Sequence, residues 1–179
     1  MTDNLTSSQR HLNMSHIHGR DTDIELLVRK RLYAAGYRYR LNAKELPGKP
    51  DILLPKYRTA IFVNGCFWHG HKGCKYYTAP KTNTDYWNAK VKRNQQRDQD
   101  VWRKLEAQGW FVIIVWECQL KKDQFDATIE SVITEIRNNG DIFKRRQEER
   151  RLARIKYLEE RRVHREKELT LLKEISNGH

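Results

Sequence analysis

Nine consecutive residues, 66–74 (CFWHGHKGC), constrain the fold of this chain more than any other segment. They place two thiols, two imidazoles and two aromatic rings in one predicted loop, residues 64–83. A loop of this length in a compact domain usually has a function or is held by something other than an apolar core. Its side chains could bind a metal ion, carry a proton or stack on a base.

Metal binding is the first hypothesis for the cysteines, because the chain has only three and an odd number cannot all pair within one chain. Cys66, His71 and Cys74 have the spacing C-x4-H-x2-C, and Cys118 at the end of a predicted buried strand could be a fourth ligand. Three sulfurs and one nitrogen suit tetrahedral Zn²⁺, and four protein ligands leave no open position, so the zinc would be structural. Alternatively, Cys118 is a small buried residue and the other thiols are free.

The charge of the chain indicates its partner. Lys and Arg number 35 against 23 Asp and Glu, which gives a formal net charge of +12 and favours a polyanion. No apolar run approaches the roughly 20 residues of a membrane span, and the polar N-terminus has no hydrophobic signal segment. We therefore expect a soluble, intracellular monomer that binds nucleic acid and no membrane.

Composition divides the chain into three parts. Residues 1–20 are a polar arm without a core of its own, residues 21–140 are a compact domain, and residues 141–179 are a charged, helical C-terminal extension. We interpret the extension as a solvated single helix, because Arg162 and Arg165 interrupt its apolar seam. A weak dimer seam and a basic strut along DNA are the alternatives.

Periodicity predicts an α/β domain. Thr22 and Glu25 have capping-box spacing at the start of a helix that Gly36 ends. Later segments alternate between short apolar runs and longer amphipathic ones, which is typical of a sheet flanked by helices. We expect strands over residues 37–41, 51–54, 59–63 and 110–116, and helices over residues 84–108 and 123–138, the last stopping at Gly140.

Asp51 follows a proline and begins an apolar strand, and a second strand follows about ten residues later. This is the layout of restriction-endonuclease-like nucleases, in which the Asp binds Mg²⁺ and an E-x-K motif normally follows on the next strand. Residues 62–64 (FVN) stand there instead. Because an isolated Pro-Asp is common at strand starts, this pattern alone does not decide whether the chain is a nuclease.

Further motifs make the comparison specific over about residues 10–120. Together they resemble the very-short-patch repair (Vsr) DNA mismatch endonuclease family. They are residues 13–14 (NM), 19–22 (GRDT), Glu25, residues 46–51 (LPGKPD), 61–62 (IF), 65–69 (GCFWH) and 115–118 (VWEC).

The resemblance implies a restriction-endonuclease-like core, with a mixed central sheet flanked by helices and a structural zinc loop. The long C-terminal helix, expected from composition, lies outside the resemblance. It implies a Mg²⁺-dependent nickase that cuts the thymine strand of a T:G mismatch, the lesion left by deamination of 5-methylcytosine, and so initiates very short patch repair. A bacterial cytoplasmic enzyme, associated with the nucleoid when on DNA, is implied. So are mismatch-repair proteins and a cognate cytosine methyltransferase as partners.

The resemblance also implies catalytic roles. Asp51 would bind Mg²⁺, and the backbone carbonyl of Val63 would replace the missing acid as a ligand. His69 would handle the proton of the attacking water, a task that suits a group titrating near neutral pH. Glu25 would support the active site, although its capping box alone would explain it. Asn64 stands where the family pattern has a second His, and an Asn can orient water but cannot carry a proton.

DNA contacts are implied for six residues. Aromatic rings would insert beside the mismatch from the major groove, at a cost that is lower for a mismatched base step. The alternative for the second helix is that Trp87 belongs to the core and that Lys90 and Asn94 are its solvated neighbours. The rings belong to Phe67, Trp68 and Trp87, Met14 would approach from the minor groove, and Lys90 and Asn94 would lie near the T:G pair.

Two other functions remain open from the sequence. The first is a zinc-stabilised DNA-binding module whose catalytic centre has decayed, which Asn64 motivates. The second is a sequence-specific restriction or defence nickase that needs no mismatch, which the long basic tail motivates.

Overall fold

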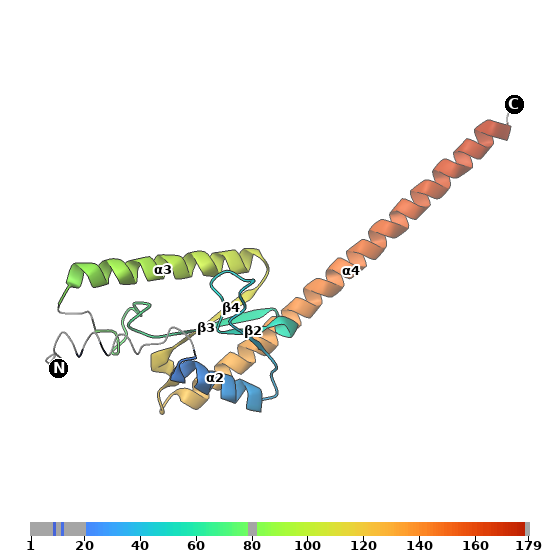
Figure 1. Ribbon diagram of the computed structural model, residues 1–179. Coiled ribbons are helices and arrows are strands. Elements are labelled where there is room, and N and C mark those ends of the chain that lie inside the picture. The colour runs from blue at the N-terminus through green and yellow to red at the C-terminus, as the bar shows by residue number, and fades with distance from the viewer. Residues whose placement is uncertain (1–8, 10–11, 13–20, 79–81, 178–179) are drawn as a thin grey trace. The chain divides into compact units, whose positions relative to one another are not determined.

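The structure is a computed structural model that describes residues 9, 12, 21–78 and 82–177 (Figure 1). A four-stranded sheet lies between helices. The elements are α2 (Asp23–Ala34), β1 (Arg40–Leu41), β2 (Ile52–Leu54), η1 (Pro55–Tyr57), β3 (Thr59–Asn64), α3 (Thr84–Ala107), β4 (Phe111–Trp116), η2 (Glu117–Leu120) and α4 (Phe125–Asn177).

The sheet is mixed, with strand order β1-β2-β3-β4. β1 pairs with β2 and β2 with β3 in antiparallel fashion, whereas β3 and β4 are parallel, with Asn64 opposite Trp116. All residues of β2 and β3 are buried, as expected of central strands covered on both faces. The predicted α/β class, a mixed sheet flanked by helices, is confirmed.

Alternation along the strands separates two apolar clusters. In the larger cluster, side chains of α2 and of the first turns of α4, such as Leu32 and Ile136, pack with strand residues such as Ile61. In the smaller cluster, Leu105 of α3 packs with Phe62 of β3. Figure 1 agrees, because α3 covers one face of the sheet and α2 the other. The start of β2 and the end of β3 are thereby fixed beneath α3.

Short-range sequence patterns predicted the starts of the helices closely, but they predicted one strand only in part. Thr22 caps α2, and the capping box with Glu25 is complete, as predicted. The strand expected over residues 37–41 has only Arg40 and Leu41 in the sheet, because β2 offers just two partners, Leu53 and Ile52, in that register.

The helix predicted to stop at Gly140 does not stop there. α4 continues from Phe125 to Asn177, so that prediction is wrong. A glycine inside a helix costs only about 1 kcal/mol relative to alanine, which the helix-forming residues after it outweigh. Asn139 also donates a hydrogen bond to Thr59 Oγ1 (3.3 Å), which holds the backbone at this point.

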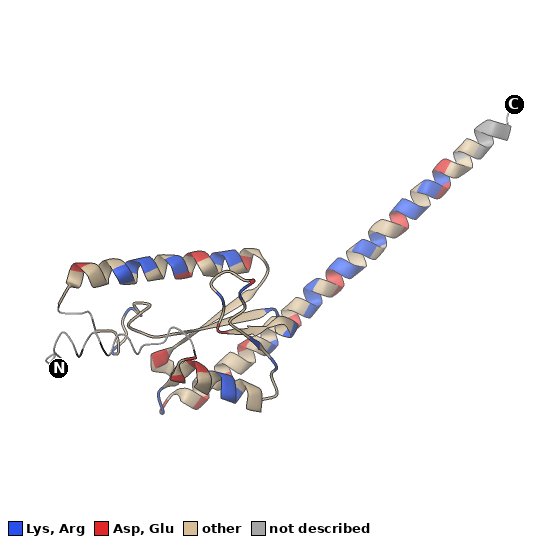
Figure 2. Cartoon of the chain, viewed as in Figure 1, with Lys and Arg blue, Asp and Glu red and all other residues tan. Residues whose placement is uncertain are grey.

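Contacts divide the chain into two compact units, Met1–Asn139 and Gly140–His179. Within the second unit, Lys and Arg alternate with Asp and Glu along α4 (Figure 2), and ion pairs such as Lys156 to Glu160 (3.9 Å) have i,i+4 spacing. This agrees with the prediction of a solvated, charged helix. Among the described residues, no helix has the length and apolarity needed to span a bilayer.

Candidate functional site

The first unit contains a pocket of about 850 Å³ that gathers most of the predicted catalytic residues. Its walls come from the N-terminus of α2, the segment before β2, the end of β3, the loop after β3, one face of α3 and the start of η2. The residues from the sequence prediction that line it are Glu25, Asp51, Val63, Asn64, Trp68, His69, Lys90 and Asn94.

Asp51 lies directly before β2, and its Oδ2 accepts a hydrogen bond from the N–H of Val63 (2.8 Å). Because the N–H and C=O of a strand residue face the same side, the Val63 carbonyl faces the side on which Asp51 lies. Burial raises the pKa of Asp51 to about 6. The hydrogen bond from Val63 acts to lower this pKa, and the nearby charge of Glu25 acts to raise it. A cation beside this carboxylate would therefore be favoured, and carboxylate and carbonyl oxygens are the ligands that Mg²⁺ prefers.

His69 has a partner that the sequence reading missed. Its Nδ1 lies 2.5 Å from Oδ2 of Asp98, a buried residue of α3. Burial acts to raise the pKa of Asp98, but the hydrogen bond and charge of His69, together with Arg97, hold it below its usual value. Asp98 falls on the same helix face as Asn94, four residues earlier, and this spacing was the only signal that could have found it.

Other side chains of α3 fix the loop around His69. Asn94 Nδ2 donates to the carbonyl of Trp68 (2.8 Å), and Gln95 Nε2 donates to the carbonyl of Gly70 (2.8 Å). A Cβ on Gly70 would lie 2.4 Å from Val91 Cγ1, and its φ of +60° also favours glycine. The loop therefore approaches the helix closely on both sides of His69, which orients the imidazole.

Asn64 ends β3 and is 3% exposed. Its Nδ2 is buried and has no hydrogen-bond partner within the described part of the chain. A buried donor without a partner is costly, so a group that enters the pocket and accepts a hydrogen bond would relieve this cost.

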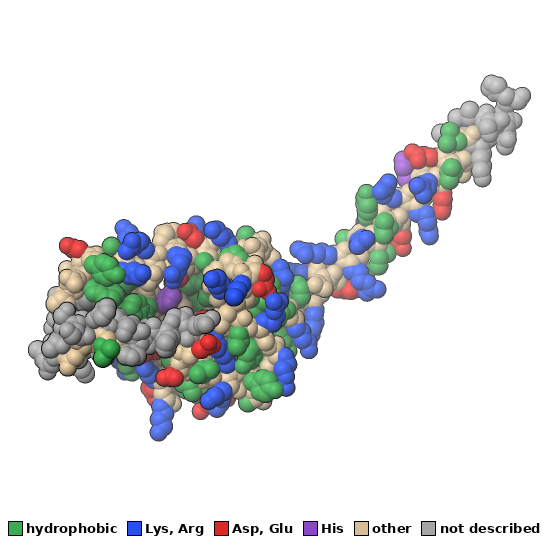
Figure 3. Space-filling model, in the orientation of Figure 1, with side chains coloured by type: hydrophobic (Ala, Val, Ile, Leu, Met, Phe, Trp, Pro, Cys, Tyr) green, Lys and Arg blue, Asp and Glu red, His purple; other side chains and the backbone are tan. Residues whose placement is uncertain are grey.

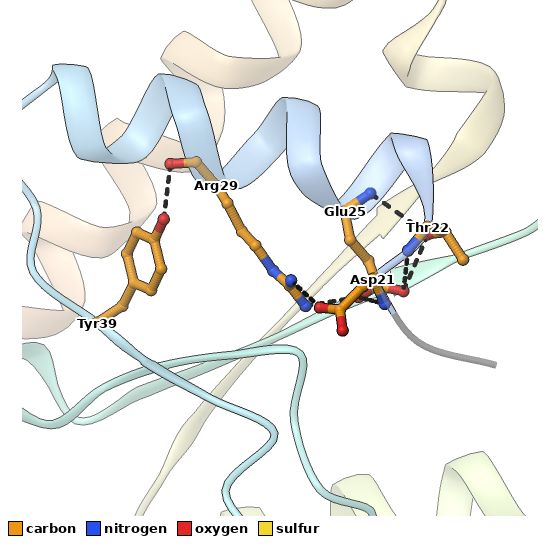
Figure 4. Close-up of polar contacts among 5 residues, drawn as sticks. All are labelled: Asp21, Thr22, Glu25, Arg29 and Tyr39. Carbon is orange, nitrogen blue, oxygen red and sulfur yellow. Dashed lines mark hydrogen bonds and ion pairs between the residues drawn. The ribbon is translucent and has the colours of Figure 1, made fainter. Parts of the chain in front are cut away.

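Glu25 lies in the first turn of α2 and is 4% exposed (Figure 4). Its Oε2 lies 2.6 Å from Nη2 of Arg29, which is buried to the same extent. The capping box predicted from the sequence therefore exists, and a buried ion pair that the sequence reading did not include is added to it.

The four predicted zinc ligands come together beside this pocket. One ligand atom from each of Cys66, His71, Cys74 and Cys118 lies within 4.8 Å of all the others. His71 Nδ1 lies 3.6 Å from Cys66 Sγ and 3.4 Å from Cys118 Sγ. Tetrahedral zinc with ordinary bond lengths separates nitrogen and sulfur ligands by about 3.6 Å, so this donor set fits zinc.

Surrounding residues orient the zinc ligands. The His71 ring stacks on Trp116, with centroids 4.0 Å apart and an interplanar angle of 4°. The N–H of His71 donates to the carbonyl of Cys66 (3.0 Å), which closes the loop between two ligands. Burial raises the pKa of the Cys66 thiol to about 12, so a thiolate there needs a cation beside it. His69 points to Asp98 and is not part of this cluster.

Phe67, Trp68 and Trp87 form one half-buried aromatic cluster next to the pocket. Their ring centroids lie 5.2–5.9 Å apart in edge-to-face arrangements. Tyr86, which is 57% exposed, extends the cluster by an edge contact with Trp87 at 5.3 Å. Trp87 is therefore not a core residue. Met14 lies outside the described residues.

Positive side chains follow the aromatic cluster along α3. Figure 3 shows Lys and Arg gathered over this helix on the face in view. Lys90 and Arg97 line the pocket itself. Such side chains could contact DNA phosphates, and the predicted roles of Lys90 and Asn94 near a base pair stay predictions.

Comparisons with known proteins show which family the chain resembles. Residues 2–75 match the model of the family described as DNA mismatch endonuclease Vsr. The chain is 50% identical over 121 residues to the type II nicking enzyme V.NmeAIP of Neisseria meningitidis, covering 68% of this chain and 86% of that protein. It is 46% identical over 120 residues to the type II nicking enzyme V.XorIIP of Xanthomonas oryzae pv. oryzae, covering 67% and 88%. It is 40% identical over 121 residues to the DNA mismatch endonuclease Vsr of Escherichia coli, covering 68% and 77%.

Proposed function

Since the chain belongs to the Vsr family of DNA mismatch endonucleases and is therefore a nicking DNA endonuclease, we propose that it hydrolyses the thymine strand at T:G mismatches with Mg²⁺ as cofactor. The observation that carries the proposal is one pocket that combines Asp51 with the His69–Asp98 pair. This pocket lies beside an aromatic cluster and a basic helix, as a nuclease that acts on distorted duplex DNA requires.

His69 is the proposed general base. Asp98 accepts a hydrogen bond from Nδ1–H, which fixes the tautomer and leaves Nε2 free to take a proton. The attacking water loses this proton as its oxygen bonds to phosphorus, the bond from phosphorus to the leaving sugar oxygen breaks, and that oxygen takes a proton from solvent. Asp98 would stabilise the imidazolium that forms, because a nearby carboxylate favours the charged ring.

Asp51 and the Val63 carbonyl would hold the catalytic cation. When bound there, Mg²⁺ would polarise the phosphate and stabilise the negative charge of the leaving oxygen. Asn64 would donate from its unpaired Nδ2 to the attacking water and so orient it, without taking part in proton transfer. Cys66, His71, Cys74 and Cys118 would hold a structural zinc that fixes the loop carrying His69.

Selection of the mismatch would rest on the aromatic cluster. Rings of Phe67, Trp68 and Trp87 can enter a base step, and unstacking costs less at a mismatch than in paired DNA. The Met14 contact, the partner proteins and the cognate methyltransferase implied by the family remain proposals of the same kind.

Cleavage of strand-labelled duplexes tests the proposal. The wild-type protein with Mg²⁺ should nick the thymine strand of a T:G duplex and leave the paired duplex intact, whereas Asp51→Asn should cut neither. A wild-type protein that binds T:G duplex without an Asp51-dependent nick would be a DNA-binding module only.

Sequence-specific nicking without a mismatch is the second candidate function. It is favoured by the relatives that are named type II nicking enzymes. The same assay with several flanking sequences separates the two candidates, because equal cleavage of paired and T:G duplexes at one sequence would favour the second.

A further inference from the structure

Arg29 joins two carboxylates at the start of α2. Its Nη1 lies 2.5 Å from Asp21 Oδ1, and its Nη2 lies 2.6 Å from Glu25 Oε2 (Figure 4). Arg29 and Glu25 are both 4% exposed, whereas the side chain of Asp21 is about half exposed. Burial of a charged pair costs free energy, and such a pair is often no more stable than an apolar pair of similar volume. The position of this ion pair beside the pocket therefore indicates a role other than stability.

The carboxylate of Glu25 has no acceptor site left. An ionised carboxylate offers about four lone-pair sites. Oε1 accepts from the N–H of Thr22 (3.4 Å) and from Thr22 Oγ1 (2.9 Å). Oε2 accepts from the N–H of Asp21 (3.1 Å) and from Arg29 Nη2. Glu25 therefore lines the pocket without a free lone pair for a metal ion.

Asp51 differs from Glu25 in this respect. Among the described residues, the N–H of Val63 is the only donor within hydrogen-bond distance of its carboxylate. Asp51 therefore keeps about three acceptor sites, and no cationic side chain in the described part of the chain pairs with it. Of Glu25 and Asp51, only Asp51 can bind a cation directly.

The capping of α2 does not explain Arg29. A capping box needs Thr22 and one oxygen of Glu25, and Oε1 supplies that bond. Arg29 binds the other oxygen. Its planar guanidinium presents a separate nitrogen to each carboxylate in a fixed fork geometry, whereas a lysine would share one nitrogen between them.

We propose that Arg29 is a positioning residue that holds Glu25 away from the metal ion, so that the pocket binds one divalent cation directly, through Asp51. The inference rests on the proposed metal site at Asp51. Without Arg29, Glu25 would be a second carboxylate without a cationic partner beside Asp51. Cation affinity rises with the number of charged ligands, so the pocket would then bind a divalent cation more tightly.

Binding of Mn²⁺, measured by electron paramagnetic resonance on the zinc-loaded full-length protein, tests this proposal without DNA cleavage. Wild-type protein should bind one Mn²⁺, and Asp51→Asn should lose it. Glu25→Gln should change the Kd for Mn²⁺ by no more than about threefold, because Arg29 already neutralises the charge it removes. Arg29→Met should bind Mn²⁺ about tenfold more tightly, and the double variant Arg29→Met/Glu25→Gln should lose that gain.

Arg31→Met is the matched control. It removes an exposed arginine of the same helix, which pairs with Asp126 at 2.6 Å, and should leave Mn²⁺ binding unchanged. If Arg29→Met fails to fold, Arg29→Lys replaces it and should show a smaller gain in affinity, because lysine keeps the positive charge beside Glu25 but loses the fixed fork of the guanidinium.

The outcomes are distinguishable. Loss of Mn²⁺ binding in Glu25→Gln would make Glu25 a direct ligand and overturn the inference. So would unchanged affinity in a folded Arg29 variant, which would leave Arg29 a purely structural residue. Retention of Mn²⁺ by Asp51→Asn would instead overturn the proposed metal site itself.

Discussion

Oδ2 of Asp98 lies 2.5 Å from Nδ1 of His69, although the two residues are 29 positions apart in the chain. The contact joins the middle of α3 to the loop after β3 and orients the one imidazole among the described residues that line the pocket. Substitution of either residue should therefore impair cleavage.

His69→Ala should abolish nearly all nicking of T:G duplex, by about 10²- to 10⁴-fold, because Asn64 cannot accept the proton in its place. Single-turnover cleavage at saturating protein measures this loss, and binding of the uncut duplex checks that the variant is folded. Appreciable nicking by His69→Ala would remove His69 from its proposed role.

Asp98→Asn should lower the single-turnover rate by about 10²-fold or more, because an amide can donate to Nδ1 and so stabilise the wrong tautomer of His69. Binding of the duplex should change little. Asp100→Asn is the control, since Asp100 lies on the same helix and its partners are two neighbouring surface side chains, Arg103 at 2.5 Å and Gln96 at 3.2 Å. Equal rates for the two variants would contradict a role for Asp98.

Substitution of the two histidines of the loop should have different effects on the zinc content of the protein. His71→Ala should lose zinc and lower the thermal midpoint by on the order of 10 °C, because zinc binding stabilises the folded loop. His69→Ala should keep the full zinc content, since His69 lies outside the ligand cluster. Zinc analysis of the purified variants and thermal unfolding measure both effects; zinc loss from His69→Ala would show that the ligands are assigned wrongly.

Trp87→Ala should weaken the preference for T:G over paired duplex. Loss of one stacking ring costs about 1–3 kcal/mol, or roughly 5- to 150-fold in the affinity ratio. Competition binding with the two duplexes measures that ratio. Tyr33→Ala, which removes an exposed ring of α2, should leave it unchanged, and an equal effect of both variants would speak against stacking by Trp87.

Deletion of residues 144–179 should preserve nicking of T:G duplex. The described residues that line the pocket all lie between Thr22 and Glu117, and the last residue of α4 in the described core is Ile136. The rate of the truncated protein, measured beside its thermal unfolding, tests this. A folded but inactive truncation would assign the extension a role in catalysis.

Much of the fold follows from short-range patterns. The capping box of Thr22 and Glu25 and the apolar run of residues 111–116 depend on neighbours within a few positions, so their periodicity predicts them. The same reasoning failed at Gly140, because packing and helix-forming neighbours outweigh the propensity of a single glycine. The three-part division of the chain at residues 20 and 140 stays a prediction.

The candidate site was predictable where chemistry and spacing coincide. The three cysteines and His71 were found because few residue types bind zinc, and the cluster that they form agrees with that prediction. The role of Asn94 was harder to foresee, because the carbonyl of Trp68 uses one N–H of its amide and leaves the other N–H and the oxygen for a base.

The amino-acid sequence alone identifies the groups that could do chemistry: Asp51 before a strand, His69 in a cysteine-rich loop, and a basic chain suited to DNA. The pairing of these groups follows from the fold. Asp98 reaches His69 across 29 positions, and Arg29 saturates Glu25 while Asp51 stays open to a cation. Residue type sets what a side chain can bind, whereas the free lone pairs and the tautomer depend on partners that folding brings within hydrogen-bond distance.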